Sequence, residues 1–169
     1  MKHTLEYISN VTTYGRFNRI LEILDSNNIP YEIQNGAHSV KNIILFPENQ
    51  KSEHITFTAH YDIIPKSSGA NDNGAAIAIL LNLAMNLNES ESKQVVIVFL
   101  DKEEFGGFGC ALYFQTYKTQ LMVNMDVCGS GDCIVICDET GLDNPYAKLF
   151  RDGMFSDIIE TDNMPYCDS

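Results

Sequence analysis

The apolar run Val-Val-Ile-Val-Phe-Leu at 95–100 constrains the fold of this chain more than any other segment. Such an uninterrupted run, rich in β-branched residues, is typical of a central strand that is covered on both faces. An Ala- and Leu-rich helical segment at 74–87 precedes it, and a helical segment at 104–117, interrupted by glycines, follows it. Strands that alternate with helices predict an α/β fold, a three-layer sandwich around a mixed, mostly parallel sheet.

The rest of the sequence continues this alternation. Asn35–Gly36 separates two strand-like runs and is a turn signal, so the sheet is expected to open with an antiparallel hairpin. No repeat, low-complexity stretch or linker interrupts the pattern, which predicts a single domain over 1–169. The expected elements are helices at 12–27, 74–87, 104–117 and 144–154, and strands at 30–35, 40–46, 54–60, 95–100, 121–126 and 133–137.

Composition excludes several classes of function. The chain has 169 residues, of which 44% are hydrophobic, and a net charge of −12. That charge argues against nucleic acid and anionic membrane surfaces as partners. The first residues contain no apolar segment typical of a signal peptide, and no apolar run approaches the ~20 residues of a membrane span. The five cysteines lack C-x-x-C spacing and are expected to be reduced thiols, so the sequence predicts a cytoplasmic protein.

Acidic groups and one imidazole follow the successive apolar runs. His60 and Asp62 come at the end of the strand expected at 54–60, and Asp126 closes the strand expected at 121–126. Glu103 and Glu104 follow the central strand, and Asp72 precedes the helix expected at 74–87. Carboxylates and an imidazole delivered to one edge of a sheet are what a dinuclear metal site requires.

Each position also has an ordinary structural interpretation. Asp62 could cap or close a turn, and Asp72 could be the N-cap of the helix that follows it. Glu103 and Glu104 could form a solvated helix N-terminus, where acids are favoured by the helix dipole. In the alternative interpretation, one glutamate binds metal while its neighbour accepts a proton. Asp126 has no Lys or Arg nearby in the sequence to form an ion pair.

Taken in order, four motifs resemble the M28 family of zinc exopeptidases. They are His60-x-Asp62, Gly-Ala-Asn-Asp72-Asn-Gly, Glu103-Glu104-Phe-Gly-Gly-Phe-Gly and Asn-Met-Asp126. The resemblance begins near Ile43 and covers about the first two thirds of a family catalytic domain. It implies a fold of the zinc-exopeptidase type and an aminopeptidase that acts on peptides with a free N-terminus.

The resemblance also implies ligands for two zinc ions. Asp72 would bridge both ions, His60 and Asp126 would complete the ligands of one, and Glu104 would bind the other. A cis peptide bond between Asp72 and Asn73 is a further feature that it implies.

Two residues have catalytic roles by the same resemblance. Glu103 corresponds to the general base that takes a proton from a metal-activated water, and Asp62 to the carboxylate that orients His60. The preferred substrate side chain cannot be inferred, because specificity depends on variable loops.

The sequence departs from the family pattern near its C-terminus. Cys167-Asp168-Ser169 stands where the family has a histidine-containing motif, and the chain ends before the family's His-Thr segment. The resemblance therefore implies a C-terminally truncated domain, in which the Glu104 site lacks a ligand. One alternative is a weakly active or inactive metal-binding domain that self-associates through an open sheet edge.

Two further alternatives concern the reaction and the metal. A glutaminyl cyclase or deacylase-type relative would be compatible with the same tandem glutamates. Histidine and carboxylate ligands also suit cobalt or manganese.

Overall fold

The structure is a computed structural model that describes residues 1–51, 54–131, 134–136, 145 and 159–161. Contacts between residues divide the chain into two units, Met1–Gly129 and Ser130–Ser169. The prediction of a single domain over 1–169 stays a prediction. No helix among the described residues is long and apolar enough to cross a bilayer.

The second unit contains one short pair of parallel strands. These strands are β6 (Ile134–Ile136) and β7 (Ile159–Thr161). β6 lies within the strand expected at 133–137. The helix expected at 144–154 lies outside the described residues apart from Pro145.

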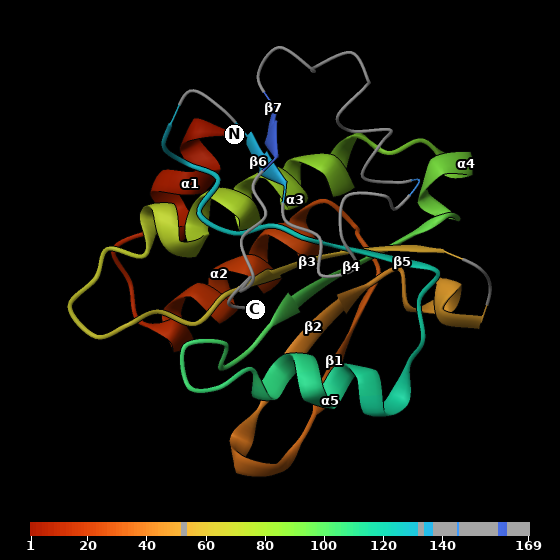
Figure 1. The fold of residues 1–169 in the computed structure, drawn as a ribbon, viewed down its shortest axis with the longest axis horizontal. Coiled ribbons are helices and arrows are strands. Elements are labelled where there is room, and N and C mark those ends of the chain that lie inside the picture. Colours follow the sequence, from red (N-terminus) through yellow and green to blue (C-terminus); the bar gives the residue numbers. More distant parts are fainter. Residues whose placement is uncertain (52–53, 132–133, 137–144, 146–158, 162–169) are drawn as a thin grey trace. The chain divides into compact units, whose positions relative to one another are not determined.

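The first unit is built on a mixed five-stranded sheet (Figure 1). β1 and β2 form the expected antiparallel hairpin, and β2 pairs antiparallel with β4. β3 pairs parallel with both β4 and β5. In spatial order the strands are β1 (Tyr31–Asn35), β2 (Lys41–Leu45), β4 (Val95–Leu100), β3 (Ile55–His60) and β5 (Leu121–Asn124).

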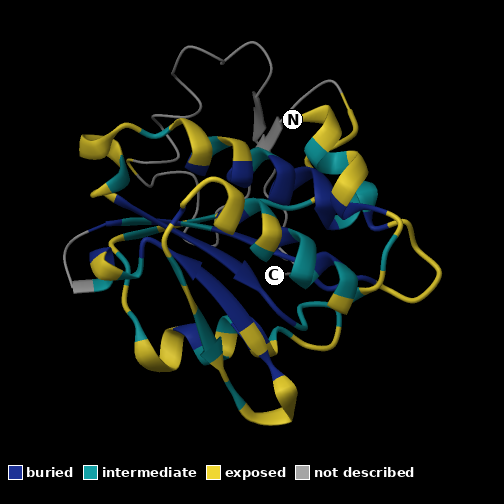
Figure 2. Cartoon of the chain, turned by 180° about the vertical axis from the view of Figure 1, so that it is seen from behind, coloured by how far each residue is buried: buried dark blue, intermediate teal, exposed yellow. Residues whose placement is uncertain are grey.

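The central strand β4 is buried on both faces, as its continuous apolar run predicts. Val95, Ile97 and Phe99 belong to one hydrophobic cluster, and alternate residues such as Val96 and Val98 belong to a second one. Both clusters are removed from solvent, and Figure 2 shows the buried sheet between more exposed helices. Successive side chains of β4 point to opposite faces of the sheet, so both faces are apolar and both need a covering layer.

Helices cover both faces of this sheet. α1 (Lys2–Ile8), α2 (Thr13–Ser26) and α3 (Ala75–Asn86) contribute apolar side chains to the larger cluster. α5 (Phe108–Thr116) covers the opposite face, where its Tyr113 is fully buried (Figure 1). This arrangement confirms the three-layer α/β fold.

Several shorter elements were not expected or differ from expectation. α1 has no counterpart among the expected helices, and α5 begins four residues later than the segment expected at 104–117. A capping box at Asn88 starts the one-turn helix α4. The remaining short elements are α4 (Glu89–Ser92), η1 (Ala37–Ser39), η2 (Pro47–Lys51) and η3 (Ala70–Gly74).

The parallel strands bring their carboxyl ends to the same edge of the sheet. His60, the last residue of β3, is in register with Leu100, the last residue of β4. Thr58 of β3 is in register with Asn124, the last residue of β5. The residues that follow these three strands therefore emerge close together, which is the placement on which the predicted site depends.

Candidate metal centre and active site

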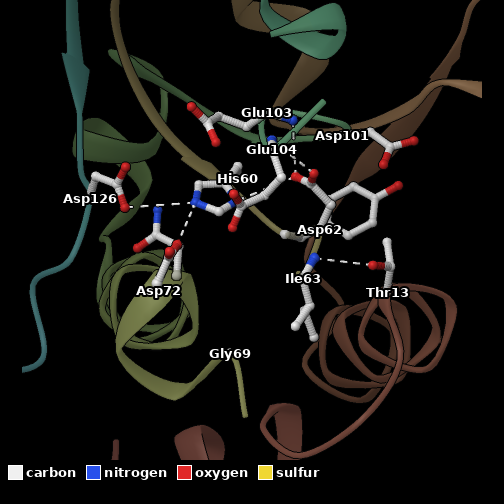
Figure 3. Close-up of polar contacts among 12 residues, drawn as sticks. Thr13, His60, Asp62, Ile63, Gly69, Asp72, Asp101, Glu103, Glu104 and Asp126 are labelled. Carbon is white, nitrogen blue, oxygen red and sulfur yellow. Dashed lines mark hydrogen bonds and ion pairs between the residues drawn. The ribbon is translucent and has the colours of Figure 1, made fainter. Parts of the chain in front are cut away.

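His60 lies at the centre of the predicted site (Figure 3). Its side chain is only 3% exposed. Nε2 lies 2.9 Å from Oδ1 of Asp72 and 3.7 Å from Oδ1 of Asp126, while Nδ1 lies 3.3 Å from Oδ1 of Asp62. One imidazole thus connects three of the carboxylates that the sequence singled out.

Asp72 reaches His60 from a tight turn between β3 and α3. The turn begins at Gly69, which has a left-handed φ of 59°, and Gly74 N donates a hydrogen bond to Gly69 O at 2.9 Å. The peptide bond between Asp72 and Asn73 is cis, as the family resemblance implies. α3 begins after Gly74 without a side-chain cap, so Asp72 is not its N-cap. The turn instead directs the Asp72 carboxylate towards His60 (Figure 3).

Asp62 fixes the segment that carries both glutamates. It is 1% exposed, and its two carboxylate oxygens accept hydrogen bonds from Glu103 N and Glu104 N, each at 3.1 Å. Oδ1 also lies next to Nδ1 of His60. A carboxylate in this position orients the imidazole and favours the tautomer that leaves Nε2 free for a metal.

The two glutamates lie close to His60 (Figure 3). One ligand atom each from His60, Glu103 and Glu104 lie within 4.8 Å of one another, and the same holds for His60, Asp72 and Asp126. Burial is the largest cause that raises the pKa of both glutamates. The charge of His60 lowers both pKa values, and the surrounding carboxylates raise them.

Asp126 lies two residues beyond the end of β5. Its Oδ1 accepts a hydrogen bond from Val127 N at 2.7 Å. The preceding Met125 is tied to the rest of the site, because its N–H donates to Thr58 O and its carbonyl accepts from Asn73 Nδ2, both at 2.9 Å. The Asp72 turn and the Asp126 segment are therefore connected by a hydrogen bond from the Asn73 side chain to the Met125 backbone.

The pKa of His60 reflects these neighbours. Burial lowers the pKa, but hydrogen bonds to Asp126 and Asp62 and their negative charges outweigh burial and raise it to about 10. The imidazole of the metal-free protein is therefore protonated at neutral pH. A metal that binds through Nε2 must displace this proton.

The donor set fits a divalent metal ion. Carboxylate oxygens converge on the His60 imidazole in two groups, one from Glu103 and Glu104 and the other from Asp72 and Asp126. Among the described residues, none of the ion pairs joins these carboxylates to a lysine or an arginine. A bound cation would compensate this concentration of negative charge. Nitrogen and oxygen ligands of this kind suit zinc.

The sequence did not identify three buried polar residues that support this site. Asn42 in β2 and Asp101 after β4 form a hydrogen-bonded network under the glutamate segment. Asn42 is a polar residue in a strand that is otherwise apolar from Ile43 to Leu45, and this pattern could have indicated a buried hydrogen-bonding role. Arg16 of α2 is fully buried, and an arginine in an amphipathic helix has no pattern that predicts burial.

Comparison with known proteins extends these observations. Residues 42–155 match the model of peptidase family M28, and this range includes all six candidate residues. The vacuolar membrane protease of Saccharomyces cerevisiae is 26% identical over 137 residues, which cover 70% of this chain and 14% of the relative. Aminopeptidase YwaD of Bacillus subtilis is 33% identical over 92 residues, which cover 50% of this chain and 20% of the relative.

A solved structure shows the same fold. The zinc aminopeptidase BSAP from Bacillus subtilis superposes with a TM-score of 0.56 and 24% identity, covering 72% of this chain and 34% of that chain. This chain spans only a small part of the length of these relatives. The family match over residues 42–155 nevertheless includes the greater part of the chain and every motif that surrounds His60. The chain belongs to peptidase family M28.

Proposed function

We propose that this chain carries the metal centre of a metal-dependent exopeptidase that removes N-terminal residues from peptides. The observation that carries the proposal is the convergence of Asp72, Asp126 and the Glu103–Glu104 pair on the buried imidazole of His60. Membership of family M28 and the likeness to aminopeptidases support the same reaction class.

We assign the metal ligands by the two groups that the structure brings together. His60, Asp72 and Asp126 form one group and would hold one ion. Glu104 belongs to the other group, with His60 and Glu103, and would contribute to a second ion together with Asp72, as the family resemblance implies. Zinc is the metal proposed, which the similarity to a zinc aminopeptidase supports. Bound zinc would polarise the substrate carbonyl and activate water as the nucleophile.

Glu103 is the residue proposed to move the proton. Its backbone N–H is fixed by Asp62, and its half-buried carboxylate faces the same space as His60. Burial raises its pKa towards the range in which a carboxylate can accept a proton and later return it. In the proposed reaction, Glu103 takes a proton from the attacking water and delivers it to the leaving amine.

The acidic surroundings favour a substrate with a free amino terminus. An α-ammonium group would be attracted by the half-exposed carboxylates of Asp72 and Asp126. A blocked N-terminus would lose this attraction. The proposal therefore distinguishes an aminopeptidase from a peptidase that cleaves within a chain.

The decisive experiment compares wild-type protein with Glu103→Gln on a panel of aminoacyl-nitroanilides and their N-acetylated forms. Glu89→Gln is a matched control, because Glu89 is an exposed residue that pairs with Lys93. We expect Glu103→Gln to abolish release at unchanged zinc content, whereas the control behaves like wild type. Activity that survives in Glu103→Gln, or equal cleavage of acetylated substrates, would contradict the proposal. Zinc binding without any turnover would favour the alternative of an inactive metal-binding domain.

A further inference from the structure

Arg16 is a buried cation beneath the candidate metal centre. It lies in the first turns of α2 and is 0% exposed, which is unusual for an arginine. Its guanidinium donates to three backbone carbonyls: Nε to Ile8 O at 3.0 Å, Nη1 to Tyr61 O at 3.4 Å, and Nη2 to Gly69 O. These carbonyls belong to three separate segments: the end of α1, the residues that follow β3, and the turn before α3.

Two of the three carbonyls belong to the segments that carry metal ligands. Tyr61 stands between His60 and Asp62. Gly69 begins the turn that carries Asp72, and its carbonyl also accepts the hydrogen bond from Gly74 N that closes this turn. One planar guanidinium therefore spans the gap between the two segments.

The packing around this contact leaves little freedom. A Cβ added to Gly69 would lie 2.3 Å from Nη2 of Arg16, so the turn and the guanidinium are in close contact. α2 holds the same region at a second point, because Ile63 N donates to Thr13 Oγ1 at 3.1 Å (Figure 3). The first turn of α2 therefore contacts both residues 61–63 and the turn that carries Asp72.

A purely structural role for Arg16 is the simpler alternative. The bond from Nε to Ile8 O connects α1 to α2, and it would contribute to stability without any relation to a metal. Yet a buried guanidinium bound only to neutral carbonyls carries a large desolvation cost. Burial lowers the pKa of Arg16 to about 10, and the charges of Asp72 and Asp62 oppose this shift. The negative charge of the site therefore offsets part of the cost of burying this cation.

We propose that Arg16 is a positioning residue, which holds the His60–Asp62 segment and the Asp72 turn at a fixed separation before any metal binds. This inference rests on the proposed metallopeptidase function. The forked geometry is essential to it, because Nη1 and Nη2 are two separate nitrogens in one rigid plane, and each donates to a different carbonyl, Tyr61 O or Gly69 O. A lysine at this position would keep the charge but would offer a single nitrogen on a flexible stem, which cannot hold the two carbonyls at a fixed separation.

The test uses Arg16→Lys together with two controls. Arg19→Lys makes the same chemical change one turn further along α2, where the side chain lies over the ring of Tyr7. Leu24→Val removes a methylene from the core side of the same helix, eight residues beyond Arg16, and controls for lost stability. Zn²⁺ affinity is measured by competition with a chromophoric chelator. Hydrogen exchange of residues 61–74 is measured on the metal-free proteins.

We expect Arg16→Lys to weaken Zn²⁺ binding by about 10- to 100-fold, as substitutions of residues that orient metal ligands do. Hydrogen exchange in residues 61–74 should also be faster in Arg16→Lys than in Leu24→Val, after each rate is corrected for the loss of urea midpoint in that variant. Arg19→Lys should leave both quantities unchanged. Cobalt-loaded Arg16→Lys should show an altered d–d absorption spectrum, which a loss of stability alone would not produce.

Two results would overturn the inference. One is unchanged Zn²⁺ affinity and unchanged exchange in Arg16→Lys, and the other is an equal effect in Leu24→Val. A wild-type protein that binds no Zn²⁺ would contradict the proposed function instead. In that case the exchange measurement still decides whether Arg16 holds the two segments together.

Discussion

Truncation of Asn42 should loosen the segment that carries the tandem glutamates. Asn42 is fully buried in β2, and its Oδ1 accepts a hydrogen bond from Asp101 N at 3.1 Å. Its Nδ2 donates to Gly109 O at 2.8 Å and to Oε1 of Gln34 at 2.9 Å. Asp101 and Gly109 are the two ends of the segment that contains Glu103 and Glu104, so one amide fastens both ends to the sheet.

The cost of Asn42→Ala follows from these contacts. Asp101 N–H would be left buried without a partner, which costs about 1–3 kcal/mol. Loss of the hydrogen bond to Gly109 O adds about 1 kcal/mol. Gln34 is only half-buried and can bond to water instead, so it adds little. We expect the free energy of unfolding to fall by about 2–4 kcal/mol.

Urea unfolding of the metal-free protein measures this change. With a slope of about 2 kcal/mol/M, the midpoint should fall by about 1–2 M at an unchanged slope. Asn35→Ala is the control, because Asn35 is exposed in the same hairpin and its side chain makes a local bond from Nδ2 to Ile33 O at 3.2 Å. It should cost less than ~0.5 kcal/mol. A loss below ~1 kcal/mol in Asn42→Ala would refute the role given to this amide.

Three further predictions concern the site. Asp62→Asn should weaken Zn²⁺ affinity about 10- to 100-fold in a chelator competition, because an amide cannot accept from both glutamate N–H groups; unchanged affinity would contradict this. Gly109→Ala should unfold at lower urea concentration than wild type, since its Cβ would lie 2.4 Å from Asp101 O; an equal midpoint would exclude the clash. The raised pKa of His60, about 10 against an ordinary 6.5, stabilises the metal-free protein fully below pH 6.5. That stabilisation should disappear as the pH rises through 10, and Zn²⁺ affinity should increase over the same range by calorimetry.

The strands could be predicted because their signals are local. The run at 95–100 is continuous, and the structure places β4 at the same residues. Helix α1 could not be predicted, because seven residues are too few for a stable isolated helix and its formation depends on packing of Ile8 in the core. The late start of α5 has a similar cause, since the backbone N–H groups of Glu103 and Glu104 bond to Asp62 rather than enter a helix.

The candidate site was predictable to the extent that strand ends determine it. His60 follows directly from the end of β3, whereas Asp72 could equally have been a helix cap until its turn was seen to face the imidazole. Arg16 and Asn42 act through contacts with residues 45 to 67 positions away in the sequence, such as Tyr61 and Gly109. Local patterns contain no information about such pairs.

Removal of the metal tests how much a bound cation stabilises the fold against repulsion among the carboxylates around His60. The carboxylates around His60 interact with that imidazole and, at longer range, with Arg16, and none of the ion pairs among the described residues joins them to a lysine, so a bound Zn²⁺ should stabilise the fold. At a free Zn²⁺ concentration 100 times the dissociation constant, the gain is about 2.7 kcal/mol. For a chain of this size, that raises the Tm by about 5–11 °C.

Thermal unfolding with Zn²⁺ and with excess chelator measures this shift. His60→Ala should abolish it, because it removes the only imidazole from the two groups of candidate ligands among the described residues. His3→Ala, at a fully exposed histidine, should retain the whole shift. A shift of equal size in His60→Ala would place the stabilising ion elsewhere. The convergence of carboxylates on His60 would then be a feature of the apoprotein alone, maintained by the protonated imidazole and by Arg16.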